Sequence, residues 1–220
     1  MSKKPYNPLM KIFFLGPEGT NSDLAARNIF KGDAEFVPLP SIEDIFEKVA
    51  MSHSYYGVIP FENSYQGVIN SSLNCLIDYD LKILKEFNFS VSHHLCSANN
   101  DFDLHEIKKI TSHPQVFGQC NNWIRNNLPD VEKVVATSTA EAASKAVKDN
   151  MLFCIANSYA IELFKLHTHL ENIQDSNDNK TRFLVIGKSI EEKAQKNKTS
   201  VMLNIADKPG SLMSILQPFT

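Results

Sequence analysis

The sequence predicts an α/β protein built of two lobes, and three observations carry this prediction. Short apolar runs alternate with segments whose apolar residues recur at helical spacing, a pattern typical of a mostly parallel sheet covered by helices. One extended stretch, residues 81–95, is long enough to carry the chain from one sheet to another. The length of 220 residues, 43% of them hydrophobic and 21% charged, fits a globular protein of more than one domain.

Strands are expected where short apolar or β-branched runs lie between turn residues. Gly16 and Pro17 mark the turn after the first run, and Pro60 is expected to end the third. In chain order the expected strands are residues 11–15, 35–37, 55–59, 81–95, 110–111, 132–136, 152–155 and 181–187.

Helices are expected where a capping side chain precedes apolar residues three and four positions apart. Thr20 and Ser41 supply such caps, and Pro114 suits a first helical turn because that turn needs no N–H donor there. In chain order the expected helices are residues 24–30, 42–50, 68–79, 103–109, 114–126, 139–148 and 158–166.

Charge and cysteine usage exclude several classes of protein. With 22 Lys and Arg against 25 Asp and Glu, the net charge of −3 gives no basic field for nucleic acid or an anionic membrane. Neither a membrane-spanning apolar run nor a signal-peptide core is visible in the sequence. The four cysteines lie far apart without a CxxC pair, so a reduced, cytoplasmic protein is expected.

Small polar residues follow four of the expected strands, and three of these turns lead directly into helices. The turns are residues 16–20 (GPEGT), 62–64 (ENS), 112–115 (SHPQ) and 137–139 (TST). Helix N-termini present free N–H groups and a positive dipole end, so several of them at one cleft suit a small dianion. Each turn taken alone is better explained as an ordinary helix cap.

Other motifs favour structural interpretations. His167 and His169 lack a third metal ligand nearby and are interpreted as a solvated loop. Cys120 lies within an expected helix without an obvious base, which indicates a buried thiol rather than a nucleophile. The segment 179–183 (NKTRF), taken alone, is interpreted as a capping loop with an exposed Arg.

The order of the motifs is more specific than any one of them. Across residues 11–188 the chain has GPEGT, ENSYQGV, SHPQVFGQC, TSTAEAA, FCIANSYAIELFKL and NKTRFLV in sequence. This series resembles the catalytic domain of prephenate dehydratases. The resemblance implies two α/β lobes similar to a type II periplasmic binding protein, with lobe 1 at about 11–92 and 167–188 and lobe 2 at about 93–166. It places the active site in a cleft between the lobes.

The resemblance also implies an activity: prephenate loses water and CO2 to give phenylpyruvate in phenylalanine biosynthesis, without a metal or organic cofactor. It makes Thr181 the essential residue, and because a hydroxyl is a weak acid we expect Thr181 to donate a hydrogen bond or relay a proton. Glu62 is the expected proton source. The residues implied to bind substrate are Thr20, Asn63, Ser64, Ser112, His113, Gln115, Ser138, Thr139, Arg182 and Phe183.

Two alternatives stay open. An arogenate dehydratase would have the same motifs, and a non-catalytic small-anion binding protein would share the two-lobed architecture. The chain also departs from the family pattern at Phe61, Phe153, Cys154 and Asn157, which we interpret as packing changes that affect fine specificity.

The C-terminal residues resemble the opening of an ACT domain, a phenylalanine-sensing module with βαββαβ topology. Residues 189–197 are expected to form a charged linker, and residues 198–220 a truncated ACT fragment with a strand at 198–206 followed by a helix start. We therefore expect phenylalanine regulation to be lost. The resemblance further implies a homodimer or a higher homo-oligomer.

Overall fold

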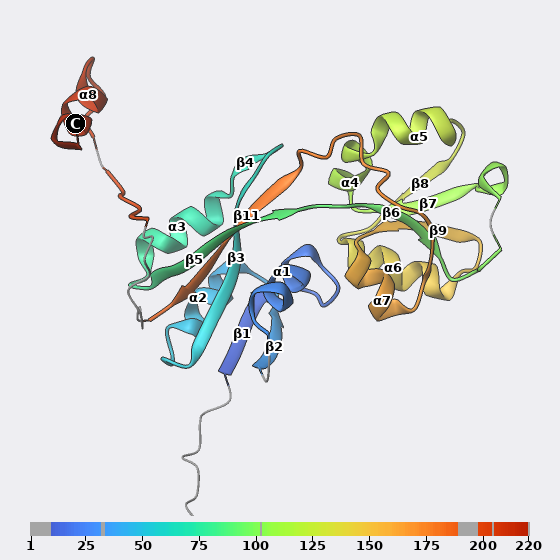
Figure 1. Cartoon of the computed structure of the whole chain (residues 1–220), viewed down its shortest axis with the longest axis horizontal. Helices are drawn as coiled ribbons and strands as arrows, with labels where there is room; N and C mark the ends of the chain where they lie inside the picture. Colours follow the sequence, from blue (N-terminus) through green and yellow to red (C-terminus); the bar gives the residue numbers. More distant parts are fainter. Residues whose placement is uncertain (1–9, 32–33, 102, 189–197, 204, 220) are drawn as a thin grey trace, which may run out of the picture. The chain divides into compact units, whose positions relative to one another are not determined.

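The computed structural model describes residues 10–31, 34–101, 103–188, 198–203 and 205–219. The chain divides into two units, Met1–Ile190 and Glu191–Thr220. The first unit holds two sheets and therefore two α/β lobes, which confirms the predicted fold class (Figure 1).

The sheet of the first lobe has the strand order β2-β1-β3-β11-β5, and the short β4 pairs with β3. β1 is parallel to β2 and β3, whereas β11 is antiparallel to both β3 and β5. The strands are β1 (Met10–Leu15), β2 (Ala34–Leu39), β3 (Tyr55–Asn63), β4 (Gly67–Val68), β5 (Lys82–Ser90) and β11 (Lys180–Gly187).

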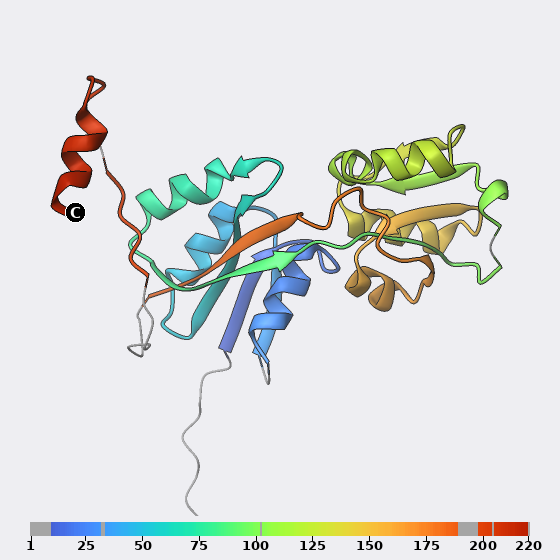
Figure 2. The same ribbon diagram turned by 45° about the horizontal axis from the view of Figure 1, so that its top comes forward.

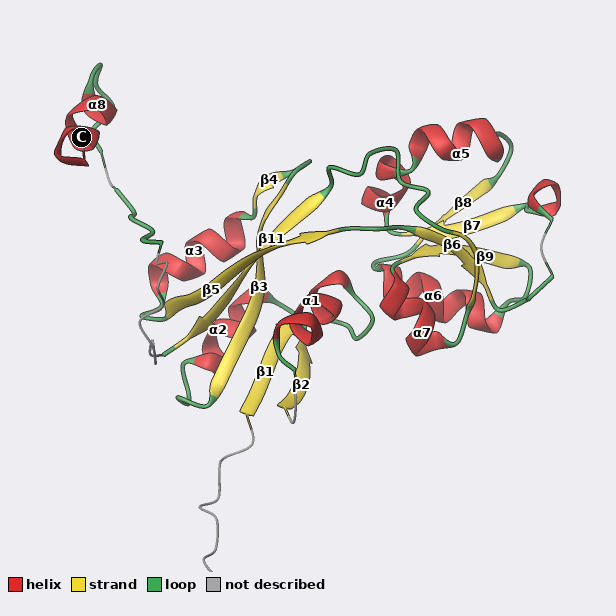
Figure 3. Cartoon of the chain, in the orientation of Figure 1, coloured by secondary structure: helices red, strands yellow, loops and turns green. Residues whose placement is uncertain are grey.

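Helices cover both faces of this first sheet (Figure 3). Helix α1 (Asn21–Ile29) packs Ala25 and Ala26 into a core that includes Phe183. Helices α2 (Ile42–Val49) and α3 (Asn70–Asp78) build the core of the opposite face, which includes Ile59 and Leu184. A buried side chain of this sheet can therefore be assigned to one face or the other by the core in which it lies.

The sheet of the second lobe has the strand order β10-β6-β9-β7-β8. Its strands are β6 (His94–Ser97), β7 (Lys109–Ser112), β8 (Glu132–Val135), β9 (Leu152–Ala156) and β10 (His167–Leu170). One core contains residues of α4 (Pro114–Gln119) and α5 (Asn121–Asn127), and the other contains residues of α6 (Thr139–Lys148) and α7 (Ser158–Phe164).

The chain passes between the two lobes twice. The first crossing joins β5 to β6, and Figure 2 shows this extended run. The second crossing, residues 171–179, joins β10 to β11. The strands next to the crossings, β6, β10 and β11, pair antiparallel with their neighbours, so both sheets are mixed rather than mostly parallel.

Several expected boundaries were wrong because contacts with distant parts of the chain decide them, by strand pairing at β3 and β10 and by hydrogen bonds to Asp175 at the Cys120 break. The segment of His167 is strand β10, not a loop, so the return to the first lobe follows Leu170 rather than residue 166. Strand β3 continues through Pro60, which lies at a register shift opposite Phe183. The expected helix at 103–109 is one short 3₁₀ turn, η1 (Leu104–Glu106), and the helix at 114–126 is interrupted at Cys120.

The second unit has one α-helix among its described residues, α8 (Ser211–Leu216), followed by the 3₁₀ turn η2 (Gln217–Phe219). The strand expected at 198–206 is not formed by the described residues there, and no ACT-like sheet is found in this part. A strand needs a bonded neighbour, and the described residues of this unit supply none. The expected linker at 189–197 lies outside the described residues.

Candidate functional site

The polar turns predicted from the sequence lie at the carboxyl ends of parallel strands. In the first sheet, Thr20 follows β1 and its hydroxyl donates to the carbonyl of Leu15 at 3.1 Å, while Asn63 ends the parallel strand β3. In the second sheet, Ser112 and Asn157 stand at the ends of β7 and β9, which are also parallel. Each sheet thus gathers its polar turns at one edge, where ligands bind in open α/β sheets.

Asn157 forms hydrogen bonds that connect the polar edge of the second sheet to that of the first. Its amide Nδ2 donates to the carbonyl of Gly19 at 3.1 Å and to Asn21 Oδ1 at 3.0 Å, both at the entrance of α1. Its Oδ1 accepts from the backbone N–H of Ala160 at 2.8 Å and so caps α7. Because Asn157 is 2% exposed, these bonds are shielded from water, and they bring the α1 entrance of the first lobe to the second lobe.

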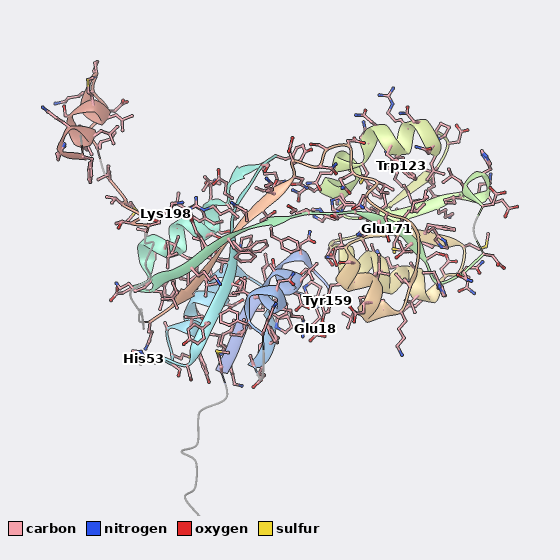
Figure 4. All side chains as sticks on the ribbon, viewed as in Figure 1. Glu18, His53, Trp123, Tyr159, Glu171 and Lys198 are labelled. Atoms are coloured by element: carbon pink, nitrogen blue, oxygen red, sulfur yellow. The ribbon has the colours of Figure 1, made fainter. Side chains whose placement is uncertain are left out.

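A second set of contacts lies beside Asn157. Asp23 accepts from the backbone N–H of Gly19 at 2.9 Å and pairs with Arg27 at 2.7 Å. The Arg27 guanidinium lies 5.0 Å from the ring centre of Tyr159 on α7. Burial raises the pKa of the Tyr159 phenol, and the carboxylates of Asp23 and Glu18 raise it further; Figure 4 labels Glu18 and Tyr159. Tyr159 is therefore a neutral phenol at neutral pH.

Thr181, Asn63 and Asn179 form a buried polar cluster at the start of β11. Asn63 Nδ2 donates to Thr181 Oγ1 at 2.9 Å and to Asn179 Oδ1 at 3.3 Å. Asn63 lies directly opposite Thr181 in the antiparallel register, which explains why both side chains lie on the same face of the sheet. All three are at most 8% exposed.

The turn after β3 is fastened to the strand that carries Thr181. The backbone N–H of Lys180 donates to Ser64 Oγ at 3.1 Å, and Ser64 returns a bond from its own N–H to the carbonyl of Lys180 at 3.0 Å. These bonds fix Ser64 and Asn63 against β11. The turn at 62–64 and the segment at 179–183, which are far apart in sequence, therefore form one structural unit.

Glu62 is not brought to Thr181. The register shift between Arg182 and Phe183 leaves Phe61 as an extra residue in β3, so Glu62 and its partner Arg182 lie on the face opposite Thr181. Arg182 pairs with Glu62 at 3.5 Å and forms a closer ion pair with Glu86. Its guanidinium lies 5.3 Å from the ring centre of Phe61. This placement does not support proton transfer from Glu62 to Thr181.

Phe183 belongs to the core. Its side chain is 1% exposed and stacks on Phe87 with ring centres 5.6 Å apart, and Phe89 meets it edge-on at 6.3 Å. A ring enclosed in this way has no face left for a ligand. The placement therefore indicates that Phe183 supports the Thr181 strand from inside the lobe.

The predicted site residues of the second lobe lie at the end of a strand or at the start of a helix. Ser112 is fully buried and its hydroxyl donates to the carbonyl of Ile155 at 2.7 Å. His113 caps α4 by accepting from the backbone N–H of Gln115 at 3.2 Å, and Ser138 caps α6 by accepting from Glu141 at 3.0 Å. Thr139 is the first residue of α6.

Two other groups have strongly shifted pKa values that fit structural roles. Bonds from Thr137 and Lys145 lower the pKa of the Glu141 carboxyl to about 2, so it is a fixed anion at the start of α6. Burial raises the pKa of the Cys120 thiol to about 12, which makes a thiolate nucleophile unavailable at neutral pH. The described residues contain no group of three or more metal-ligating side chains, and none of their helices is long and apolar enough to cross a membrane.

Sequence reasoning missed two residues of this region. Asn157 was interpreted as a packing change, although its place directly after an apolar strand was a signal for a cap facing the other lobe. Asn179 was noted only as part of a capping loop, and its burial at 1% depends on the crossing chain, which no local pattern reveals.

Comparisons with known proteins agree with this arrangement. Residues 12–191 match the family model of prephenate dehydratase. The chain is 35% identical over 210 residues to the bifunctional chorismate mutase/prephenate dehydratase of Aquifex aeolicus, covering 96% of this chain but only 58% of that protein. It is 35% identical over 215 residues to the prephenate dehydratase of Methanocaldococcus jannaschii, covering 94% of this chain and 77% of the relative.

A solved structure gives the same result. The prephenate dehydratase of Arthrobacter aurescens, in complex with L-Phe, superposes with a TM-score of 0.81 at 26% identity, covering 95% of this chain and 71% of that one. The match of the family model over most of the chain and the 35% identity to a relative covered over 77% of its length lead to one conclusion: the chain belongs to the prephenate dehydratase family.

Proposed function

We propose that this chain converts prephenate to phenylpyruvate, water and CO2, as a carbon–oxygen lyase of phenylalanine biosynthesis. The observation that carries the proposal is the buried Thr181 hydroxyl, held by Asn63 at 2.9 Å, in a chain that belongs to this family. Prephenate is a dianion with a ring hydroxyl, so it needs anion-binding groups and one hydrogen-bond donor at the leaving oxygen.

The chemistry assigned to Thr181 follows from the bonds that break. The ring carboxylate leaves as CO2, its bonding electrons make the ring aromatic, and the ring hydroxyl departs and takes up a proton to become water. Thr181 Oγ1 accepts from Asn63, so its own proton is directed to another acceptor. We assign to Thr181 a hydrogen bond to the departing hydroxyl, where a positioned donor lowers the barrier most, while the proton that completes the water molecule comes from solvent.

The remaining predicted residues are proposed to bind the substrate's carboxylates or to support those that do. Thr20 and Ser138 stand at the entrances of α1 and α6, whose first-turn N–H groups favour anions. The substrate-binding set proposed here is Thr20, Ser64, His113, Gln115, Ser138 and Thr139. Asn63, Ser112, Arg182 and Phe183 are assigned to support, because their side chains are engaged within their own lobes.

The test is turnover of prephenate by the wild-type chain and by Thr181→Val, followed by the absorbance of phenylpyruvate. Removing one positioned donor should lower kcat by about 100-fold or more. Thr181→Ser keeps the hydroxyl and is the matched control, expected to retain most of the rate. Near-normal turnover by Thr181→Val would exclude this role, and side-by-side rates with arogenate decide between the two substrates.

The second proposal concerns regulation. The Arthrobacter aurescens protein was solved with L-Phe, whereas the described C-terminal residues of this chain form no sheet that could build an ACT-type pocket. L-phenylalanine is therefore expected not to inhibit the 220-residue chain. Turnover is measured with and without L-phenylalanine, and the Arthrobacter aurescens protein serves as the binding control. Strong, saturable inhibition of this chain would contradict the proposal.

A cytoplasmic location and a homo-oligomeric state complete the proposal. All four cysteines are free thiols, which suits a reducing compartment. Apolar side chains of the second unit, such as Met213 at 80% exposure and Phe219 at 70%, are the kind of surface that a second copy would cover. Light scattering of the purified chain measures the oligomeric state, and a monomer at all concentrations would refute that part.

A further inference from the structure

The amide of Asn179 is the most unusual polar group near Thr181. Its side chain is 1% exposed, yet its Nδ2 is buried without a hydrogen-bond partner among the described residues. Its Oδ1 accepts from Asn63 Nδ2 at 3.3 Å. A buried donor that remains unsatisfied costs stability, so a residue with only a packing role would be better replaced by an apolar one.

The bonds around Asn63 fix the orientation of both amides. The backbone N–H of Tyr65 donates to Asn63 Oδ1 at 2.9 Å, so the opposite side of that amide is Nδ2 with its two hydrogens. One hydrogen is directed to Thr181 Oγ1 and the other to Asn179 Oδ1. Asn179 must therefore present its oxygen to Asn63, which leaves its own Nδ2 unpaired.

Asn179 is itself held by the first crossing between the lobes. Its backbone carbonyl accepts from the N–H of Val91 at 3.0 Å, and Val91 lies on the segment that leaves β5. The two crossing segments thus set the position of Asn179, whose Oδ1 is one of the three partners that hold the Asn63 amide, beside Thr181 Oγ1 and the N–H of Tyr65. The direction of the Thr181 hydroxyl proton depends on this chain of contacts, because Asn63 occupies the accepting side of Thr181 Oγ1.

We propose that Asn179 is a positioning residue: its side-chain oxygen holds the Asn63 amide so that the Thr181 hydroxyl donates its hydrogen bond to the ligand. The inference rests on the proposed function and deepens it. It assigns to Asn179 a role in turnover rather than in binding, because Asn179 acts through Asn63 and not on the substrate.

The experiment compares Asn179→Leu with Asn179→Asp. Leu has a similar shape but no acceptor, so kcat should fall at least about tenfold while KM stays within about twofold. The free energy of unfolding should not fall with kcat, because Leu removes the unpaired Nδ2 while leaving only one Asn63 hydrogen unpaired. Asp restores an acceptor for Asn63, so kcat should return to within about fivefold of wild type. Its charge should raise KM for the dianionic substrate instead.

Asn177→Leu is the matched control, since Asn177 lies on the same crossing segment but is exposed. It should leave kcat and KM unchanged. Wild-type kcat in Asn179→Leu would overturn the proposal. So would a parallel loss of kcat and stability in both Asn179 variants, because that result indicates a structural role alone.

A ligand-free measurement separates this inference from the proposed function. The side-chain amide protons of Asn63 are followed by NMR in the wild-type chain and in Asn179→Asp and Asn179→Leu. The Asn63 signals should shift and exchange faster with solvent in the Leu variant but not in the Asp variant. Identical Asn63 signals in all three proteins would refute the role of Asn179, whereas absence of prephenate turnover in the wild type would refute only the function.

Discussion

Thr181 and Glu62 come from adjacent strands, yet their side chains leave the first sheet on opposite faces. The register shift at Phe61 is the cause, because one extra residue in β3 puts Phe61 and Glu62 on the same face as Arg182. Without the shift, alternation along β3 would put Glu62 on the other face and Asn63 away from Thr181. A single extra residue therefore decides which member of the ENS turn meets the Thr181 hydroxyl.

This geometry gives a prediction for Glu62→Gln. Glu62 pairs with Arg182 at 3.5 Å at a half-exposed position, and Arg182 keeps its closer partner Glu86. The variant should therefore retain kcat to within about fivefold of wild type, equivalent to about 1 kcal/mol. Steady-state turnover of prephenate checks this. A loss comparable to that of Thr181→Val would instead make Glu62 the proton source.

At the scale of elements, the Asn157 side chain performs two tasks at the N-terminus of α7. Asn157 Oδ1 caps the helix, and Nδ2 reaches across to Gly19 and Asn21 of the other lobe. A serine in this position retains a capping oxygen but has no second group that extends to the other lobe. The two tasks can therefore be separated by substitution.

We predict that Asn157→Ser lowers the free energy of unfolding by about 1 kcal/mol, because it loses the contacts between the lobes but keeps the cap. Asn157→Ala should lose about 1 kcal/mol more, the usual worth of a helix cap. Urea unfolding of both variants and the wild type measures the two steps. Equal stabilities of the Ser and Ala variants would mean that the cap contributes nothing here.

The sequence predicts those elements whose signals are local. Thr20 and Ser41 were identified as helix caps, and each accepts from the backbone N–H three residues on, as does Ser138 of the predicted 137–139 turn. The end of β3, the break at Cys120 and the strand containing His167 depend on partners far along the chain, which are β11, Asp175 and β6 respectively. For the site, motif order predicted which turns gather at the sheet edges, but not the face on which Glu62 lies or the burial of Asn179.

At the scale of the whole molecule, a buried histidine ties the two crossings to each other and to the second lobe. His93 is 1% exposed, and its Nε2 lies 2.6 Å from Gln119 Oε1 of α4. The backbone N–H of His93 donates to Gln174 Oε1 on the second crossing at 3.0 Å. Protonation of this ring would place a charge where both crossings meet the second lobe.

The stability of the molecule should therefore fall in weak acid. Burial lowers the pKa of His93 from its ordinary 6.5 in the folded state, so the unfolded chain binds the proton more strongly. The stabilisation is complete above about pH 6.5 and is lost as the pH falls below that value. Urea unfolding at several pH values should show a weaker decline for His93→Gln than for wild type. His53→Asn, at an exposed position, is the control and should follow the wild type.

The strand order of the first sheet has a consequence for the order of assembly during synthesis. β11 lies between β3 and β5, although it is made more than 80 residues after both of them, and the whole second lobe emerges from the ribosome in between. The second lobe is one continuous segment and can form as soon as β10 is available. The edges of β3 and β5 that pair with β11 stay unpaired until β11 has been made. The first lobe is therefore expected to be the last to complete its fold.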